Sequence, residues 1–297
     1  MNLNYNSAAE LRAFLDGNSL GMRKKYGQNF LINPGVRQDL VSALGADTGD
    51  SVWEIGPGLG AMTRLLLDRG LAVRAFEIDP GFARLLRELF AGEENFTLVE
   101  GDALKTWPAQ PPAPYLLGNL PYNIAAILLA GFIEQGRFFK RVVVTVQREV
   151  ALRMAAVPGS PDYSSFSVLC ASAYRVKPLM LIKSASFYPR PNVDSQGVLL
   201  ELREDADHVW PPCFYPLLRQ LFSSRRKMIK NNLTGFLASR SRVPPAAMAA
   251  EVLAKSAING NRRAEDLSLE DFAALAKGIE DVGILIEDVS RRQHRKT

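Results

Sequence analysis

Short strand-like runs alternate with helix-like stretches between about Asp50 and Leu202, and this alternation limits the fold more than any other feature of the chain. The strand candidates are rich in β-branched and aromatic residues: Ser51–Ile55, Leu71–Phe76, Phe96–Val99, Tyr115–Leu117, Arg141–Val146, Pro178–Ile182 and Gly197–Leu202. Helical patterns lie between the early ones, at Met62–Arg69, Gly81–Phe90 and Ile124–Gln135. The alternation predicts an α/β fold with a doubly wound, mostly parallel seven-stranded sheet and helices on both of its faces.

The segments on either side of this region are helical in pattern. Pro34–Leu44 is typical of an amphipathic helix, with Asn33 as its N-cap and a proline at its first position. The run Arg203–Pro212 is charged and then rich in proline, as linkers are, and no strand pattern follows it. We therefore expect two domains: residues 1–206, which carry the sheet and an N-terminal helical extension, and residues 207–297, which are all helical.

Composition excludes several classes of protein. The chain has 297 residues, of which 47% are hydrophobic and 23% charged, so a disordered, collagen-like or disulfide-rich chain is excluded. Its only cysteines, Cys170 and Cys213, belong to no Cys/His cluster, and we expect neither a metal site nor a disulfide. No signal-peptide pattern is present, and the longest apolar stretch, Ile124–Ile133, is about half a membrane span. The expectation is a cytoplasmic protein without membrane contact and, in the simplest case, a monomer.

The first strand candidate runs into a glycine-rich turn, Gly56-Pro57-Gly58-Leu59-Gly60-Ala61, that precedes a helix. Glycine is needed where a ligand approaches the backbone at a sharp turn, because a Cβ atom would obstruct it. Gly56, Gly58 and Ala61 match the pattern G-x-G-x-x-G/A of nucleotide-binding turns. Glu77 follows at the end of the next strand, where a carboxylate would hold ribose hydroxyls. These residues predict a nucleoside site, and both NAD and S-adenosylmethionine (AdoMet) contain the required ribose.

Another acid, Asp102, follows the third strand candidate in the run Glu100-Gly101-Asp102-Ala103. Because the carboxyl ends of parallel strands meet at one edge of a sheet, Asp102 would reach the same site as Glu77. There it would accept a hydrogen bond from the exocyclic amine of a bound adenine. A helix cap or turn is the alternative role for an aspartate in such a run.

The most informative segment is Gly118-Asn119-Leu120-Pro121-Tyr122, at the end of the fourth strand candidate. The Asn119 side-chain oxygen and the Leu120 carbonyl can accept the two hydrogens of an aromatic amine, which aims the nitrogen lone pair at an incoming methyl group. Pro121 fixes the backbone, and Tyr122 can stack on a base that has been pulled out of its helix. The segment favours methyl transfer to a nucleobase amine, and a plain strand-to-helix turn is the alternative.

Taken together, eight segments of the chain resemble the ribosomal RNA adenine dimethyltransferase family. In order along the sequence they are KKYGQNFL (Lys24–Leu31), EIGPGLG (Glu54–Gly60), FEID (Phe76–Asp79), GDA (Gly101–Ala103), NLPYN (Asn119–Asn123), QREVALRM (Gln147–Met154), FYPRPNVDS (Phe187–Ser195) and SSRRKMIKNNL (Ser223–Leu233). The resemblance is greatest to the bacterial branch that acts on the small ribosomal subunit.

This resemblance implies a Rossmann-like class I methyltransferase that uses AdoMet as methyl donor and no metal. It implies dimethylation of two adjacent adenines in a hairpin near the 3′ end of 16S ribosomal RNA in the small subunit, a step of ribosome biogenesis. The implied AdoMet-site residues are Asn29, Leu31, Gly56, Gly58, Glu77, Asp102 and Asn119. Asn119, Leu120, Pro121 and Tyr122 are implied to hold the target amine, and Phe187 to close the base pocket on the other face.

Other classes of function stay open from the residues alone. An NAD-dependent oxidoreductase shares the Gly56 turn and Glu77, but it gives the segment that begins at Asn119 no role. A non-enzymatic RNA-binding or assembly factor, or a transcription factor, would keep the fold without the reaction. A related branch of the family acts on large-subunit RNA, and only overall likeness separates it from the small-subunit branch. Phe187, taken without the resemblance, is better explained as a core aromatic residue than as a residue that stacks on a base.

Positive charge gathers in the C-terminal part of the chain. Lys and Arg number 36 against 31 Asp and Glu, a net charge of +5. Residues 1–206 contain 21 of each kind, so the whole excess lies in residues 207–297. It includes Arg225, Arg226, Lys227 and Lys230, and helical geometry would place Arg226 and Lys230 on one face. A charge run is usually a solvated surface, but in a base-modifying enzyme it predicts contact with RNA phosphates.

Overall fold

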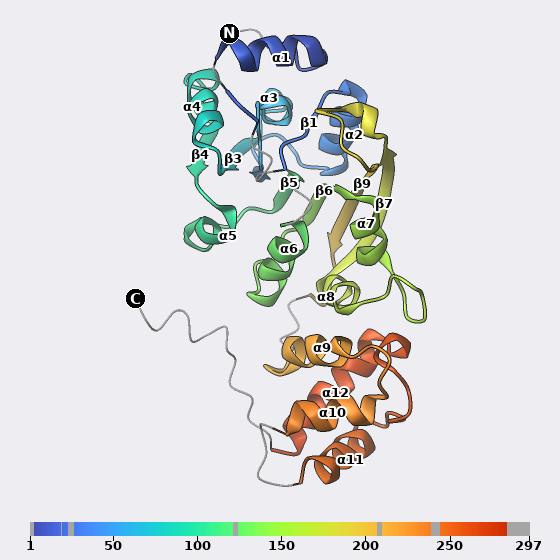
Figure 1. Cartoon of the computed structure of the whole chain (residues 1–297). Helices are drawn as coiled ribbons and strands as arrows, with labels where there is room; N and C mark the ends of the chain where they lie inside the picture. Colours follow the sequence, from blue (N-terminus) through green and yellow to red (C-terminus); the bar gives the residue numbers. More distant parts are fainter. Residues whose placement is uncertain are drawn as a thin grey trace. The chain divides into compact units, whose positions relative to one another are not determined.

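The computed structural model describes residues 3–18, 20–22, 27–120, 124–206, 210–238 and 244–283 (Figure 1). Pro121 and Tyr122 lie outside these ranges. The chain divides into two compact units. Unit 1 comprises Met1–Phe132, Arg137–Ala151 and Arg175–Leu202, and unit 2 comprises Ile133–Gly136, Leu152–Tyr174 and Arg203–Thr297. Unit 2 thus includes Leu152–Tyr174, a segment that the sequence pattern assigns to the first domain.

Unit 1 is built on a seven-stranded sheet with the strand order β4-β3-β2-β5-β6-β9-β7. The strands are β2 (Ser51–Ile55), β3 (Ala72–Glu77), β4 (Phe96–Glu100), β5 (Tyr115–Asn119), β6 (Arg141–Gln147), β7 (Tyr174–Ile182) and β9 (Ser195–Leu202). Strands β4, β3, β2, β5 and β6 pair in parallel, and β9 pairs antiparallel with β6. The predicted α/β class with a doubly wound, mostly parallel seven-stranded sheet is confirmed.

The order of the strands locates the ligand-binding edge. From β2 the chain moves outward through β3 and β4 and then returns to form β5 on the other side of β2. Doubly wound sheets bind ligands outside the carboxyl ends of the strands where the order reverses in this way. Ile55 at the end of β2 is in register with Phe76 of β3 and with Gly118 of β5. Glu77 and Asn119, one residue beyond each of these partners, therefore stand at the reversal point.

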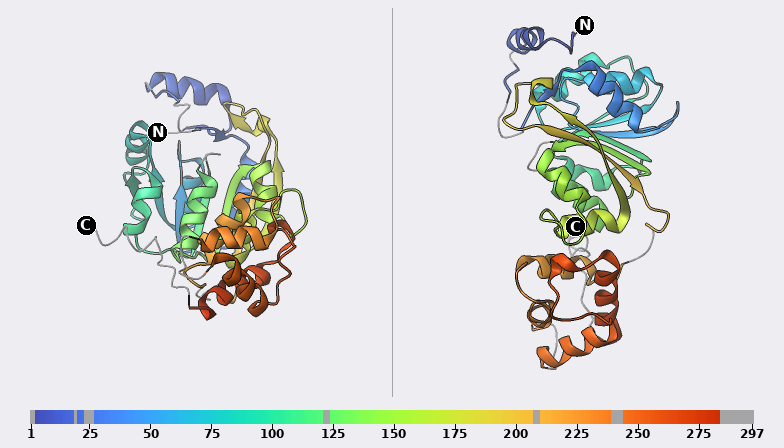
Figure 2. Two further views of the ribbon diagram at one scale, coloured as in Figure 1. Left: turned by 60° about the horizontal axis from the view of Figure 1, so that its bottom comes forward. Right: turned by 90° about the vertical axis from the view of Figure 1, so that its right-hand side faces the viewer.

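Helices cover both faces of this sheet (Figure 2). The helices that begin in unit 1 are α1 (Ala8–Gly17), α2 (Pro34–Ala43), α3 (Ala61–Asp68), α4 (Pro80–Leu89), α5 (Ala103–Thr106), α6 (Ala125–Glu134) and α7 (Arg148–Ala155). Leu40 of α2 and Leu66 of α3 pack in one buried cluster with Val52. The next residue of β2, Trp53, faces the opposite side and packs against Phe132 of α6, with ring centroids 6.1 Å apart.

Helix α2 begins as the sequence predicts. The Asn33 side chain accepts a hydrogen bond from the Val36 amide at 3.2 Å, and Pro34 occupies the first position. Helix α1, in contrast, was not predicted from the sequence. Its signals are a serine N-cap, Ser7, and buried leucines one helical turn apart, Leu11 and Leu15.

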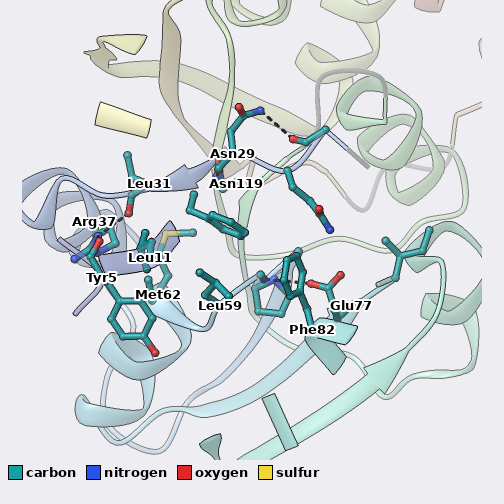
Figure 3. Close-up of a pocket in the computed structure, with 18 residues that line it drawn as sticks. Tyr5, Leu11, Asn29, Leu31, Arg37, Leu59, Met62, Glu77, Phe82 and Asn119 are labelled. Carbon is teal, nitrogen blue, oxygen red and sulfur yellow. Dashed lines mark hydrogen bonds between the residues drawn. The ribbon is translucent and has the colours of Figure 1, made fainter. Parts of the chain in front are cut away.

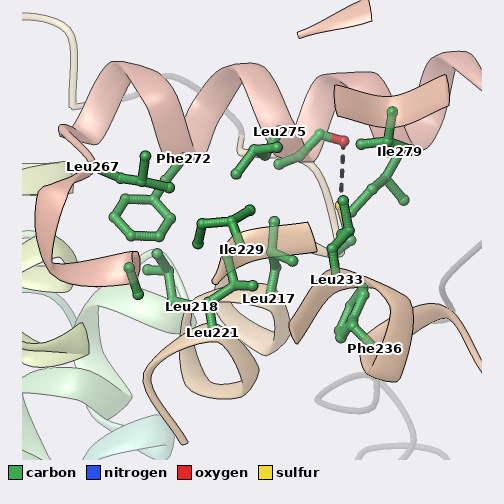
Figure 4. Close-up of a cluster of buried hydrophobic side chains, with 14 of the residues drawn as sticks. Leu217, Leu218, Leu221, Ile229, Leu233, Phe236, Leu267, Phe272, Leu275 and Ile279 are labelled. Carbon is green, nitrogen blue, oxygen red and sulfur yellow. Dashed lines mark hydrogen bonds between the residues drawn. The ribbon is translucent and has the colours of Figure 1, made fainter. Parts of the chain in front are cut away.

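Unit 2 contains α8 (Ser165–Ala173), α9 (Phe214–Ser223), α10 (Ile229–Leu237), α11 (Pro245–Lys255) and α12 (Leu269–Asp281). Figure 4 shows its core, where Leu217 and Leu221 of α9 meet Leu233 of α10 and Phe272 of α12. Helix α10 begins at Ile229, so Arg226 precedes it. The expectation that Arg226 and Lys230 share a helix face is therefore wrong. In the described ranges, no helix is long and apolar enough to cross a membrane.

Candidate functional site

A pocket opens at the carboxyl ends of β2, β3 and β5 in unit 1 (Figure 3). The space inside it, with the open solvent at its mouth included, is about 750 Å³. Six of the seven residues implied for the AdoMet site line it: Asn29, Leu31, Gly56, Gly58, Glu77 and Asn119. The fold thus gathers residues from three strand ends and from the loop before α2.

Three glycines shape the turn after β2, and two of them, Gly56 and Gly58, line the pocket. Gly56, Gly58 and Gly60 have φ values of +70°, +58° and +83°, a left-handed conformation that side chains strongly disfavour. A Cβ atom on Gly58 would lie 3.0 Å from the Phe30 ring, and one on Gly60 would lie 2.7 Å from the Phe90 ring. The turn therefore needs glycine both for its backbone conformation and for the close approach of the two aromatic rings.

Glu77 holds this turn through its carboxylate. The backbone amides of Gly58 and Asp79 donate to its two oxygens at 3.2 and 2.8 Å. The side chain is only 4% exposed, and burial raises its pKa to about 7 against the opposing effect of these amide donors. Each oxygen keeps a lone pair for a further donor, so a pair of ribose hydroxyls at the pocket wall would find acceptors here.

Asp102 does not line the pocket. It is the N-cap of α5, and its side chain accepts a hydrogen bond from the Leu104 amide at 3.0 Å. The preceding residue, Gly101, donates its amide hydrogen to the Glu77 carbonyl at 2.8 Å. The backbone just before Asp102 is therefore bonded to the end of β3, where Glu77 lies. The capping role is the one that the structure shows, and the adenine contact stays a prediction.

Asn119 is oriented by the segment opposite it. Its side-chain amide donates to the Asn29 carbonyl at 2.7 Å, so its Oδ1 atom is left to accept hydrogens (Figure 3). Leu120 is held by its own amide, which donates to the Thr145 carbonyl at 3.1 Å, and its side chain is buried. A Cβ atom on Gly118 would lie 2.6 Å from the end of the Leu120 side chain and 3.3 Å from the Ile55 carbonyl oxygen, so a larger residue there would require the Leu120 side chain to move. Asn119 at the end of β5 and Leu120 directly after it are therefore each held by a hydrogen bond to another segment.

Phe187 lies in the core. It begins β8 (Phe187–Tyr188), which pairs antiparallel with β1 (Phe30–Leu31), and its partner in the register is Leu31. The side chain is 3% exposed and packs in the same cluster as Leu40. Phe187 thus supports a residue that lines the pocket but does not line it itself. Its contact with a target base stays a prediction.

Sequence reasoning missed several residues of the pocket. Those not singled out include Tyr5, Leu11, Phe30, Arg37, Met62, Ile78 and Phe82. Most are apolar and resemble ordinary core positions in the sequence, because only the fold shows which core residues face a cavity. For Leu11, the signals in the sequence were the serine N-cap of α1 and its i, i+4 pair of leucines, which indicate a helix but not a pocket.

Glu54, behind the glycine turn, is fully buried. The Thr63 hydroxyl donates to its Oε2 atom at 2.7 Å, whereas Oε1 has no hydrogen-bond partner among the residues that the structure describes. Burial is the main cause that raises the pKa of this carboxyl group to about 7. The folded protein therefore holds the proton over a pH range in which the unfolded chain releases it.

This difference predicts a loss of stability as the pH rises. Between about pH 4.5 and 7 the folded state binds more protons at Glu54 than the unfolded state, so the free energy of unfolding falls by up to about 3 kcal/mol. Glu54→Gln keeps an acceptor for Thr63 and removes the titration. Urea unfolding at pH 5 and pH 8 should show a smaller loss in this variant than in the wild type, and equal losses would contradict the assignment.

The four cations predicted to bind RNA have different surroundings in unit 2. Arg225 forms an ion pair with Glu265 at 2.5 Å and donates to the Pro161 carbonyl at 2.9 Å. The Lys230 ammonium donates to the Asn261 side chain at 2.9 Å. Arg226 and Lys227 are exposed, and no described residue forms a side-chain hydrogen bond or ion pair with them. Arg225 thus supports the unit, and the other cations are more available to a polyanion.

Comparisons with known proteins agree with this geometry. The family model for ribosomal RNA adenine dimethylase matches residues 20–281. The ribosomal RNA small subunit methyltransferase A of Treponema denticola is 44% identical over 92% of this chain and 94% of its own length. The protein of the same name from Borreliella afzelii is 37% identical over 93% of this chain and 95% of its own length.

Two solved structures have a similar fold. A dimethyladenosine transferase from Plasmodium falciparum superposes with a TM-score of 0.76 at 27% identity, covering 85% of this chain and 98% of that one. The 23S rRNA methyltransferase ErmE superposes with a TM-score of 0.61 at 22% identity, covering 84% and 99%, and shows the fold alone. Since the family match extends over most of its length, this chain belongs to the ribosomal RNA adenine dimethylase family.

Proposed function

We propose that the protein transfers methyl groups from AdoMet to the exocyclic amines of two adjacent adenines, two to each, in a hairpin near the 3′ end of 16S ribosomal RNA. The observation that carries this proposal is the orientation of Asn119, whose amide donates to the Asn29 carbonyl at the wall of the pocket that Glu77 and the glycine turn also line. The relatives' names support the small-subunit target. The proposal includes a role in ribosome biogenesis, in the cytoplasm, as a monomer.

The residues of the pocket suit AdoMet. Glu77 would accept hydrogen bonds from the ribose hydroxyls, and the glycine turn from Gly56 to Gly60 lets a ligand approach the backbone. Asn29 and Leu31 would hold the methionine end, and Asp102 the adenine. Bound AdoMet supplies an electrophilic methyl group on a positive sulfonium, which is already a good leaving group.

Residues of the chain orient the nucleophile, which is the exocyclic amine of the adenine. An aromatic amine is a poor nucleophile because its lone pair is delocalised into the ring. Hydrogen bonds from the amine to Asn119 Oδ1 and to the Leu120 carbonyl favour a tetrahedral nitrogen with its lone pair aimed at the methyl group. After the first transfer the amine keeps one hydrogen, so one of these acceptors suffices to orient the second transfer. Pro121, Tyr122 and Phe187 complete the proposed base pocket.

The RNA is held, in this proposal, by the exposed cations of unit 2. Arg226→Ala combined with Lys227→Ala should weaken RNA binding and lower the slope of log K against log salt by about one to two, because each phosphate contact releases roughly 0.7 to 0.9 counterions. AdoMet affinity should not change. Titration of labelled RNA at several salt concentrations measures this slope.

Arg225→Ala is the control for that pair of substitutions. Because Arg225 is tied to Glu265 and to the Pro161 carbonyl, its removal should lower the thermal stability of the protein as well as affect RNA binding. An unchanged salt slope in the Arg226/Lys227 variant would contradict the proposed RNA contact.

Donor identity is tested by calorimetric titration of the protein with AdoMet and with NAD. The proposal predicts binding of AdoMet and no binding of NAD. Binding of NAD alone would favour an oxidoreductase instead.

A further inference from the structure

We propose that the N-terminal segment, through Tyr5 and Leu11, forms one wall of the methyl-donor pocket, and that docking of α1 and binding of the donor are therefore thermodynamically coupled. This inference rests on the proposed function only for the identity of the donor. The segment from residue 3 to residue 18 precedes the part of the chain that the family model matches, which begins at residue 20.

The first observation is the position of Leu11. It is 1% exposed, belongs to the same buried cluster as Leu59 of the glycine turn and Phe82 of α4, and is one of the residues that line the pocket. In the view of Figure 3 it lies on the same side of the pocket as Met62 and Leu31 and away from Glu77. Leu15, one helical turn further along α1, is 2% exposed in the same cluster but does not line the pocket. The two leucines are thus equally buried in one cluster, and they differ in that only Leu11 lines the pocket.

The second observation is a buried cation that joins the N-terminal segment to the pocket. Arg37 of α2 is 5% exposed, and it donates to the Leu31 carbonyl at 2.6 Å, to the Tyr5 carbonyl at 3.3 Å and to the Asn6 side chain at 2.5 Å. Burial of a guanidinium is costly unless its donors are paired, and here the two Nη atoms find acceptors, whereas the buried Nε has none among the described residues. The pairing therefore favours the arrangement in which Tyr5 and Leu31, both at the pocket, are held together.

The length of α1 explains why docking is conditional. Its ten residues are fewer than an isolated helix needs to be stable in water, and Leu11 and Leu15 are its only buried residues. Packing against the rest of unit 1 must therefore supply the free energy that keeps α1 helical, and a ligand that contacts Leu11 or Tyr5 adds to it. By linkage, docking must strengthen ligand binding by the same factor.

The test compares matched variants by calorimetric titration with AdoMet. Leu15→Ala should raise the dissociation constant about threefold, because it weakens docking alone. Leu11→Ala should raise it about tenfold, because it weakens docking and also removes a wall of the pocket. Leu233→Ala, in the core of unit 2, should lower thermal stability without changing the dissociation constant. Asn6→Ala, which removes one acceptor of Arg37 outside the pocket, should behave like Leu15→Ala.

A second readout does not depend on any substitution. Hydrogen exchange of the wild-type amides in residues 8–17 should slow when AdoMet is added, by the factor with which docking strengthens binding. The inference is overturned if Leu11→Ala binds AdoMet as well as the wild type does, or if exchange in α1 is unaffected by AdoMet. Failure of the wild-type protein to bind AdoMet would instead overturn the proposed function.

Discussion

Replacement of Asn119 with alanine is expected to lower kcat for methyl transfer by about 10²- to 10³-fold. The substitution removes one of the two acceptors that orient the target amine, and it also removes the hydrogen bond to the Asn29 carbonyl. Because the sulfonium is a good leaving group without any help from the protein, orientation of the nucleophile is the main contribution left to the chain. Single-turnover transfer of labelled methyl groups to small-subunit RNA measures the effect.

Donor binding distinguishes this catalytic role from a binding role. Asn119 lies at the edge of the donor pocket, so its loss should change the AdoMet dissociation constant by less than about tenfold. A variant that keeps nearly full kcat would contradict the orientation of the amine by Asn119. A variant whose AdoMet affinity falls as far as its rate would assign the residue to donor binding alone.

Glu77→Ala is expected to raise the AdoMet dissociation constant by about 10²-fold or more. It removes the carboxylate that would accept the ribose hydroxyls, and it leaves the amides of Gly58 and Asp79 without their acceptor, which loosens the glycine turn. RNA affinity, which depends on other residues, should stay within about twofold. Calorimetric titration with AdoMet and a separate RNA titration measure the two effects.

Glu77→Gln is the matched control. The amide keeps one acceptor oxygen and nearly the same shape, so the dissociation constant should rise only about tenfold. It also removes the cost of ionising a buried carboxyl group whose pKa is raised to about 7. If Glu77→Ala bound AdoMet as tightly as the wild type at equal thermal stability, the ribose contact would be excluded.

The sheet could be predicted from the sequence because its strands are buried and regularly spaced. Central strands such as Val142–Val146 are continuous runs of β-branched residues, which is the pattern of a strand buried on both faces. Asn33-Pro34 is a local signal for the start of α2. The glycine turn and Glu77 were predictable for the same reason, since the strand ends determine which residues share one edge of the sheet.

What could not be predicted depends on partners that are distant in the sequence. Arg225 looks like any other surface cation until the fold places Glu265 beside it. Asp102 fits a cap and a ligand contact equally well in the sequence, and only the fold shows that it caps α5 through the Leu104 amide. Leu11 is an ordinary core leucine until the glycine turn and α4 enclose a cavity next to it.

The central claim is tested most directly by mass mapping of ribosomal RNA after incubation of the protein with labelled AdoMet and under-methylated small subunits. The account predicts label in two adjacent dimethyladenosines near the 3′ end of the small-subunit RNA, with two methyl groups on each, and almost none with Asn119→Ala. Label at another nucleotide, or no labelled dimethyladenosine from a protein that binds AdoMet, would contradict it.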